Sequence, residues 1–544
     1  MKIKYILLFL VAWMTSMSSA YAQQTVTASG LVMDEKGEAL IGVSVSVKEV
    51  PSMGAITDLD GRFRMTGIKA GNTLLISYIG YDTQEIRMTK SDERMRVVLK
   101  ESANLVDEVV ITASGKVQKK INVTGAITGV EVATLKTPAS SVTNMLGGRV
   151  PGIISVTRSG EPGKDFSEFW VRGISTFGAG QGALVLIDGI EGDLNTLDPE
   201  DIESFSILKD ASSTAVYGVR GANGVVLVST KKGKAGKLNL QVKANAGISY
   251  SARMPEFVNA ATYAALANEA AVTRGRIPIY SDVDVDLFRN HMDPDLHPDV
   301  NWRDVILKDY TWNQQYFLSA SGGGEVARYY ISAGFTTKDA IFKQDKDVNR
   351  YNTNVNYNKF NFRANVDVNV TSTTTLSLNE ETVIVSQNYP GYGNDTKALW
   401  EAQSNLTPVT VPLMYTTGEA PGYGSGNSEI SPYVLLNMTG YQKLYSNNNK
   451  ITMQLNQDLK MVTPGLSISG LVNIDSYSAL TQMRQKMPAI YYAYGRNRDG
   501  TLNLEKMSES RDPSYGNYQD SSRKFYWEFR LNYDSGTSFY CRAV

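Results

Sequence analysis

The stretch F-N-F-R-A-N-V-D-V-N-V, residues 360–370, decides the fold, because two kinds of side chain alternate along it without a break. Apolar residues occupy the even positions, and Asn, Arg or Asp occupies the odd positions. Period-two alternation is the pattern of a β-strand whose two faces meet different surroundings. Its length also fits the roughly 9 to 11 residues of a tilted strand that crosses a bilayer. The stretch predicts a membrane-crossing strand with an apolar outer face and a polar inner face.

The same alternation returns along the second half of the chain. Further candidate strands are residues 238–246, 451–459, 466–474 and 525–533. A soluble sandwich also alternates, so one strand of this kind decides nothing. Several long ones, with aromatic residues near their ends and 30 Tyr in the chain, favour an antiparallel transmembrane barrel from about residue 237 onward.

The N-terminal residues predict export. Lys2 and Lys4 precede an apolar run, and Ala20-Tyr21-Ala22 matches a signal-peptidase cleavage pattern. No Cys stands near that point, so the exported protein is not expected to be a lipoprotein. Beyond residue 22 no apolar stretch reaches the length of a spanning helix, so any membrane crossing must be made by strands.

Composition excludes several classes of function. Lys plus Arg, 54, nearly equals Asp plus Glu, 55, which gives no electrostatic argument for nucleic-acid binding. The single Cys, Cys541, excludes an intrachain disulfide. The only histidines, His291 and His297, do not begin an H-x-x-E pair, so we predict neither a zinc enzyme nor a cofactor.

Residues 23–100 predict a small β-sandwich. Val43, Val45 and Val47 alternate with polar residues, and the segments 34–37 and 58–61 combine Asp with Gly as turns do. The segment N-L-V-D-E-V-V-I-T-A-S-G, residues 104–115, follows as a β-prone linker. The residues alone leave two equal alternatives for it: a strand added to a partner's sheet edge, or the first strand of the next domain.

Residues 117–236 mix charged turns with short strands. Glycines at 218, 221 and 224 predict tight turns against close neighbours. The charged residues Arg172, Asp188, Asp210 and Arg220 either pair inside a polar lumen or lie solvated at the surface. The run of lysines from 231 to 237 is interpreted as a solvated junction with the barrel.

Four parts of the chain resemble the SusC/RagA family of TonB-linked outer-membrane transporters. Residues 57–63 (T-D-L-D-G-R-F) and 77–85 resemble the non-catalytic carboxypeptidase-regulatory-like sandwich found ahead of such transporters, and D-E-V-V-I-T-A, residues 107–113, looks like their TonB box. The motifs W-V-R-G-I-S (170–175), L-V-L-I-D-G-I (184–190) and the block 207–233 closely resemble their plug domain. Residues 301–304, 321–330 and 456–470 look like their barrel.

The resemblance implies a mainly β protein with five parts. These are a signal peptide (1–22), a carboxypeptidase-regulatory-like β-sandwich (23–100), a linker with the TonB box (101–116), an α+β plug (117–236) and an incomplete transmembrane β-barrel (237–544). The implied TonB box is Asp107, Glu108, Val109, Val110, Ile111, Thr112 and Ala113. The implied plug motif is Arg172, Gly173, Asp188, Gly189, Asp210, Tyr217, Gly218, Arg220, Gly221, Asn223 and Gly224.

The implied function is active import without bond chemistry. In the family, TonB with ExbB and ExbD pulls the box from the periplasmic side, a SusD-like lipoprotein caps the barrel, and glycans or oligopeptides are the cargo. The surrounding outer-membrane lipid is a further expected partner. The alternatives are a receptor that signals to a periplasmic partner, and a surface adhesin or enzyme, which would leave the box and plug motifs unexplained.

Two insertions and the end of the chain complete the expectations. Residues 255–271 predict a short packed helix. Residues 281–299, rich in Asp with both histidines, predict an acidic solvent loop in preference to a cation site. Residues 237–544 have room for about ten strands, whereas plugged barrels have about 22, so we expect a truncated or frameshifted chain.

Overall fold

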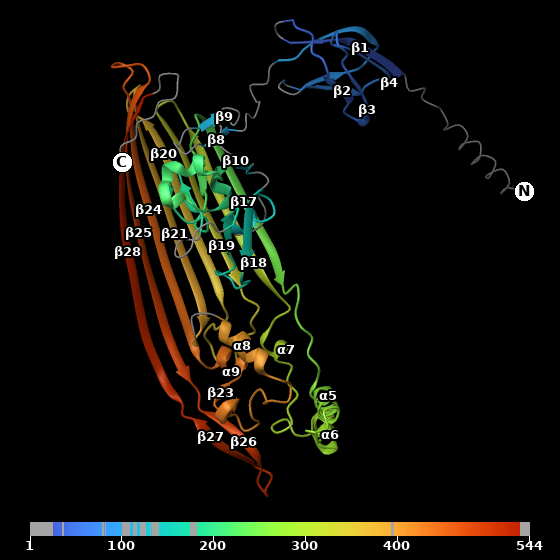
Figure 1. Ribbon diagram of the computed structural model, residues 1–544, viewed down its shortest axis with the longest axis vertical. Helices are drawn as coiled ribbons and strands as arrows, with labels where there is room; N and C mark the ends of the chain where they lie inside the picture. The colour runs from blue at the N-terminus through green and yellow to red at the C-terminus, as the bar shows by residue number, and fades with distance from the viewer. Residues whose placement is uncertain are drawn as a thin grey trace, which may run out of the picture. The chain divides into compact units, whose positions relative to one another are not determined.

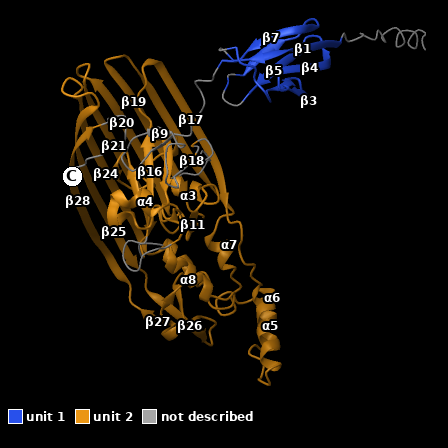
Figure 2. Cartoon of the chain, turned by 45° about the horizontal axis from the view of Figure 1, so that its top comes forward, with its two compact units in different colours: residues 1–109, 119–122 blue, residues 110–118, 123–544 orange. Residues whose placement is uncertain are grey.

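The computed structural model describes residues 25–34, 37–78, 81, 83–100, 109–111, 117–119, 127–130, 132, 141–173, 182–392 and 396–533. The predicted signal peptide and Cys541 lie outside these ranges. The chain forms two compact units, residues 1–109 with 119–122 and residues 110–118 with 123–544 (Figure 2). Each unit has its own core.

The first unit contains the predicted sandwich. One sheet has the order β4-β1-β7 and the other the order β3-β2-β5-β6. Val43, Val45 and Val47 are fully buried between the sheets, which confirms the alternation read from the sequence. The strands are β1 (Thr25–Met33), β2 (Ser44–Val47), β3 (Val50–Ile56), β4 (Arg62–Lys69), β5 (Thr73–Ser77), β6 (Gln84–Arg87) and β7 (Asp92–Val98).

A mixed sheet with short helices forms the plug, which here means the described residues from 127 to 231. The sheet order is β10-β15-β16-β13-β14, and β11 and β12 form a separate hairpin. Residues 225–228 of β16 are buried on both faces, as expected for a central strand. The elements are β10 (Ile127–Val130), α3 (Val142–Leu146), β11 (Ile153–Thr157), β12 (Ser167–Val171), β13 (Leu184–Ile187), β14 (Ile190–Glu191), η2 (Pro199–Asp201), β15 (Ile202–Leu208), α4 (Ala211–Thr214), η3 (Ala215–Gly221) and β16 (Val225–Thr230).

A large antiparallel sheet lies behind the plug (Figure 1). Its order is β17-β18-β19-β20-β21-β24-β25-β28. Along β20 the predicted alternation holds, with Phe360 38% exposed and Arg363 4% exposed. Apolar residues thus face outward and polar residues face the plug, the reverse of a soluble protein. The strands are β17 (Gly236–Tyr250), β18 (Tyr310–Gly323), β19 (Ala327–Asp339), β20 (Asn356–Asn369), β21 (Thr374–Pro390), β24 (Gly440–Asp458), β25 (Leu466–Met487) and β28 (Arg511–Tyr533).

Some strands are much longer than predicted. β25 has 22 residues and β28 has 23, against the 9 expected for each from the alternation. At about 3.3 Å per residue such strands span roughly 70 Å, more than twice the roughly 30 Å of bilayer hydrocarbon. Residues 511–524 of β28 are polar on both faces, so the apolar alternation marks only the part of the strand that suits lipid.

Connections of two lengths alternate along the sheet. The turns 324–326, 370–373 and 459–465 are short, and the end that carries them is called the short-turn end. The connections 251–309, 340–355, 391–439 and 488–510 lie at the other, long-connection end. They hold α5 (Ala260–Val272), α6 (Asp282–Asn290), α7 (Trp302–Ile306), α8 (Lys397–Asn405), η4 (Ser425–Asn427), α9 (Pro432–Asn437), β22 (Ala420–Tyr423), β23 (Glu429–Ile430), β26 (Ile490–Arg496) and β27 (Leu502–Ser508). None of the helices in the described ranges is both long and apolar enough to cross a membrane.

The helix predicted at 255–271 is confirmed as α5, which begins after its cap Asn259, whose side chain accepts a hydrogen bond from Thr262 N at 2.9 Å. The acidic solvent loop predicted at 281–299 is wrong for residues 282–290, which form helix α6. Ser281 and Asp284 begin this helix with a capping box, in which each side chain accepts a hydrogen bond from the other residue's backbone N–H. Residues 291–299 form no helix or strand, in agreement with the prediction, although Asp295 is buried. Within the described ranges, no group of three or more His, Cys, Asp or Glu is arranged to hold a metal ion.

Candidate functional site

The predicted TonB box lies only partly within the described residues. Its central residues, Val109–Ile111, form β8, which is hydrogen-bonded to β9 (Val117–Lys119). Asp107, Glu108, Thr112 and Ala113 fall outside the described ranges. The extended backbone expected of the segment is present at its centre, and its role toward TonB stays a prediction.

Two of the predicted plug arginines pair within the plug. Arg172 Nη1 lies 2.9 Å from Asp210 Oδ1, and the arginine side chain is 54% exposed. Arg220 pairs with Glu191 at a similarly exposed position. These pairs are solvated at the plug surface, which was one of the two alternatives left open by the sequence.

Asp188 follows the other alternative, pairing inside the molecule, because its side chain faces the large sheet. With Gly189 it forms the turn between β13 and β14, and both residues have positive φ, 51° and 88°. An Asp-Gly pair of this conformation is a favoured two-residue hairpin turn. The Asp188 carboxylate accepts hydrogen bonds from Thr230 N (2.9 Å) and Thr230 Oγ1 (2.6 Å). This fixes the hairpin to the end of β16.

The predicted glycines allow close packing in the plug. At Gly224, φ is 89° and an added Cβ would lie 2.7 Å from the Val171 Cβ. Asn223 beside it is 4% exposed, and Tyr217 packs against the apolar cluster around β13 and β16. The other motif glycines are Gly173 and Gly218, both with positive φ, and Gly221, which lies against Thr214.

A buried acidic turn, L-D-P-E-D at 197–201, was not singled out from the sequence. Asp198, Glu200 and Asp201 are 5%, 5% and 3% exposed. Asp198 caps the turn by accepting from Glu200 N at 2.9 Å, with Pro199 at the first position. Burial, helped by the nearby charge of Asp201, raises the pKa of Asp198 from 3.8 to about 6. Buried carboxylates need partners, and the large sheet supplies them.

The acidic turn is held by two strands of the large sheet. The Asp201 carboxylate accepts from Ser332 Oγ at 2.6 Å and from Tyr330 OH at 2.9 Å, both on β19. Glu200 pairs with Lys243 of β17, with 2.6 Å between Nζ and Oε1. The turn therefore links the plug to both β17 and β19.

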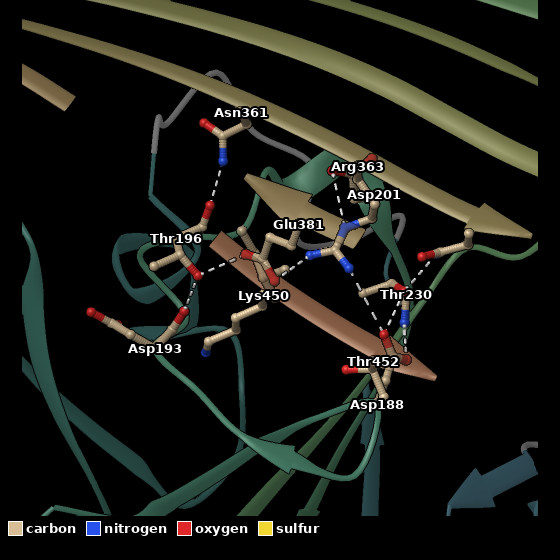
Figure 3. A network of polar contacts seen from close by, with 12 residues as sticks. Asp188, Asp193, Thr196, Asp201, Thr230, Asn361, Arg363, Glu381, Lys450 and Thr452 are labelled. Atoms are coloured by element: carbon tan, nitrogen blue, oxygen red, sulfur yellow. Dashed lines mark hydrogen bonds and ion pairs between the residues drawn. The ribbon is translucent and has the colours of Figure 1, made fainter. Parts of the chain in front are cut away.

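Arg363 of β20 is the centre of the densest network (Figure 3). Its guanidinium lies 2.8 Å from Glu381 of β21, 3.7 Å from Asp201 and 3.9 Å from Asp188. Glu381 also accepts from Thr196 Oγ1 of the plug at 3.1 Å. Charges of both signs are thus paired between plug and sheet, as buried charges must be.

Other polar side chains of the sheet hold backbone groups of the plug. Lys359 Nζ donates to Asn195 O at 2.6 Å, and Asn361 donates to the carbonyl of Thr196. Asn365 donates to Lys231 O at 2.7 Å. The contact between plug and sheet is made by hydrogen bonds and ion pairs to a degree unusual for a domain interior.

The sequence identified half of this contact. Asn361, Arg363 and Asn365 stand on the predicted polar face of 360–370, but nothing in the sequence named their partners. The signal for the acidic turn was available, since Asp before Pro at a helix start is a capping pattern. Its burial was not readable, because isolated acidic residues are usually solvated.

Two family models match the chain. Residues 28–111 match the CarboxypepD_reg-like domain, and residues 119–225 match the TonB-dependent receptor plug domain. The chain is 32% identical over 352 residues to TonB-dependent receptor SusC of Bacteroides thetaiotaomicron, covering 62% of this chain and 32% of that protein. It is 34% identical over 353 residues to TonB-dependent receptor P39 of Formosa agariphila, covering 64% and 32%.

Among solved structures, the chain resembles the RagAB peptide importer in its open-open state. The TM-score is 0.55 at 18% identity, and the match covers 78% of this chain and 55% of that one. The closed-closed state gives a TM-score of 0.53. The chain thus spans about a third of the length of the curated relatives it matches.

Proposed function

Because this chain belongs to the SusC/RagA family of TonB-dependent receptors, we propose that it takes part in active, TonB-driven import of a bulky nutrient across the outer membrane. The polar contact between plug and sheet carries the proposal. Water can replace ion pairs and hydrogen bonds one by one when a plug is pulled, whereas apolar packing would expose surface to water at a cost of about 25 cal/mol per Å².

The alternating connections support an orientation for this function. In outer-membrane barrels the short turns face the periplasm and the long loops face outside. We therefore assign the short-turn end, the sandwich and the TonB box to the periplasmic side. TonB with ExbB and ExbD would pull residues 107–113 there.

A SusD-like lipoprotein is the partner proposed for the long-connection end, and the cargo is a glycan or an oligopeptide. Support comes from the likeness to SusC and to the fold of a peptide importer.

The test of energy coupling compares two substitutions at one residue, Val110, in the gene at its own locus. Val110→Pro removes the backbone N–H and disfavours strand pairing. Val110→Thr keeps the backbone N–H and a β-branched side chain, so it still allows strand pairing. We expect Val110→Pro to abolish accumulation of a labelled oligosaccharide or oligopeptide while surface binding persists, and Val110→Thr to transport normally. Equal uptake by both variants, and by a deletion of 107–113, would show that the box does not couple energy.

The same cells separate import from signalling. If the labelled cargo changes transcription but never accumulates in the wild type, the chain is a receptor that signals to a periplasmic partner, and the import proposal fails.

A further inference from the structure

We propose that cargo passes between the plug and the inner face of β17 and β18, and that the Glu200–Lys243 ion pair is the gate that closes this route. The inference rests on the proposed import function and adds to it the side of the plug on which the passage opens.

Two cavities lie at opposite ends of the same pair of strands. At the long-connection end, a cavity of about 520 Å³ is bordered by Asp165 of the plug, Ser249 of β17 and Asn313 of β18. At the short-turn end, a cavity of about 460 Å³ is bordered by Asn239 of β17 and Ser319 of β18. Each is large enough to hold several residues of a polar chain.

The inward-facing residues of β17 and β18 form a line between the two cavities. Successive inward positions on β17 are 239, 241, 243, 245, 247 and 249, and on β18 they are 313, 315, 317, 319 and 321. Midway, Lys243 and Phe317 approach Glu200 of the plug and leave about 10 Å³, the room of about one water molecule. Between the two larger cavities, this narrow space marks where the plug's acidic turn meets β17.

The lining suits passage of a polar chain. On the side of β17 and β18, away from the constriction, the inward side chains are mostly Asn, Gln, Ser and Thr, as at Asn245, Gln315 and Ser321. Such groups exchange hydrogen bonds with water or with a sliding chain without the desolvation cost of a charge. The charged side chains of the two cavities lie elsewhere in the lining, as at Asp165 and Lys338 in one and at Lys231 and Lys234 in the other.

Further along the same sheet, at β20 and β21, the plug is held more firmly. Arg363, buried at 4% exposure, joins Glu381 to plug carboxylates, and Asn361 and Asn365 hold plug carbonyls. In the gate pair the Glu200 side chain is 6% exposed but the Lys243 side chain is 35% exposed, so water reaches the lysine and weakens their attraction. A pull on the plug would thus separate it from β17 before it separates from β20 and β21.

Two serines provide a matched test of the route. Ser319 on β18 and Ser377 on β21 both face inward near the short-turn end and are 5% and 6% exposed. Each is changed to Cys in a Cys541→Ser background, and a cell-impermeant maleimide is added outside living cells together with cargo. Asn313→Cys, at the long-connection cavity, serves as the labelled reference.

With TonB active, we expect Ser319→Cys to be labelled at least tenfold faster than without TonB, and Ser377→Cys to stay protected in both. Labelling of Ser377→Cys ahead of Ser319→Cys, or equal labelling of the two, would overturn the proposed route.

The gate is tested without TonB, which keeps it independent of energy coupling. In cells lacking TonB, Glu200→Gln combined with Ser319→Cys should raise the labelling rate at least tenfold. Glu85→Gln, which removes a carboxylate from an equally short 2.6 Å ion pair with Lys48 in the sandwich, should leave it unchanged. If Glu200→Gln leaves the rate of Ser319→Cys labelling unchanged, the ion pair is not a gate. If the Val110 variants take up cargo without TonB, the proposed import function itself is refuted.

Discussion

Replacing Arg363 by Met should loosen the plug more than any other single change in the polar contact. The guanidinium is 4% exposed and lies within 4 Å of Glu381, Asp201 and Asp188. Met fills most of the volume but leaves these carboxylates without their shared cation. Removing one partner of a buried ion pair costs about 3–5 kcal/mol. Because 1.36 kcal/mol corresponds to a tenfold change in an equilibrium constant, this cost raises the population of the detached plug roughly 200- to 5,000-fold.

Hydrogen exchange of the plug strand β15 reports on that population. Its amides are paired with β10 and β16, and a plug that has lost its contacts with the large sheet opens these pairs more readily. In purified full-length protein, peptides covering 202–208 should exchange faster by the same factor in Arg363→Met. Arg484→Met is the matched control, since Arg484 stacks on Tyr515 of β28, with 5.1 Å to the ring. Adding Glu381→Gln to Arg363→Met should restore part of the protection. Exchange within threefold of wild type in Arg363→Met would refute the view that this arginine anchors the plug.

Three further outcomes follow from single side chains. Gly224→Ala should cost about 2–4 kcal/mol of plug stability, seen as a lower temperature of protease sensitivity, because φ is 89° and the new Cβ would meet Val171. The pKa of Asp198 is raised from 3.8 to about 6, so the stability linked to its protonation is lost as pH rises through 6. Asp198→Asn should therefore resist urea better than wild type at pH 7.5, by up to roughly 3 kcal/mol, and equally at pH 3.5. Hydrogen bonds from Arg496 hold the pKa of Asp293 below its ordinary 3.8. They join β26 to the segment that follows α6, and this link stabilises the fold above pH 3.8 and weakens as pH falls through the lowered pKa. Arg496→Met should thus speed proteolysis of connection 488–510 at pH 7 and have little effect in strong acid.

The fold was predictable wherever the two faces of an element meet different surroundings. Residues 360–370 fixed the inward and outward faces of β20, and the valines at 43, 45 and 47 did so for the sandwich. Strand ends were not predictable, because beyond the lipid both faces of β28 are polar and alternation disappears. The loop predicted over residues 282–290 was wrong for a related reason. Asp282 and Asp284 lie in the first turn of a helix, and composition alone does not distinguish such a turn from a loop.

The candidate site was predictable only as a list of residue types. Asp188 was named for its motif, but its partners Thr230 and Arg363 lie 42 and 175 residues away, and no local pattern joins them. Arg172 and Arg220 carried the same expectation and instead pair near the plug surface. Long-range pairing of charges depends on which strands become neighbours, and the sequence of one strand does not contain that information.

The distribution of charge around the plug has a mechanical consequence. Glu200 and Asp201 are adjacent, yet one faces Lys243 on β17 and the other faces Ser332 and Arg363 on β19 and β20. A small rotation of this turn about its Asp201 side would break the Glu200 contact while the Asp201 contacts persist. The plug then need not leave the barrel for a passage to open. The energy required is that of the contacts of Glu200 with Lys243 and Gln241, worth at most a few kcal/mol, instead of that of the whole buried network.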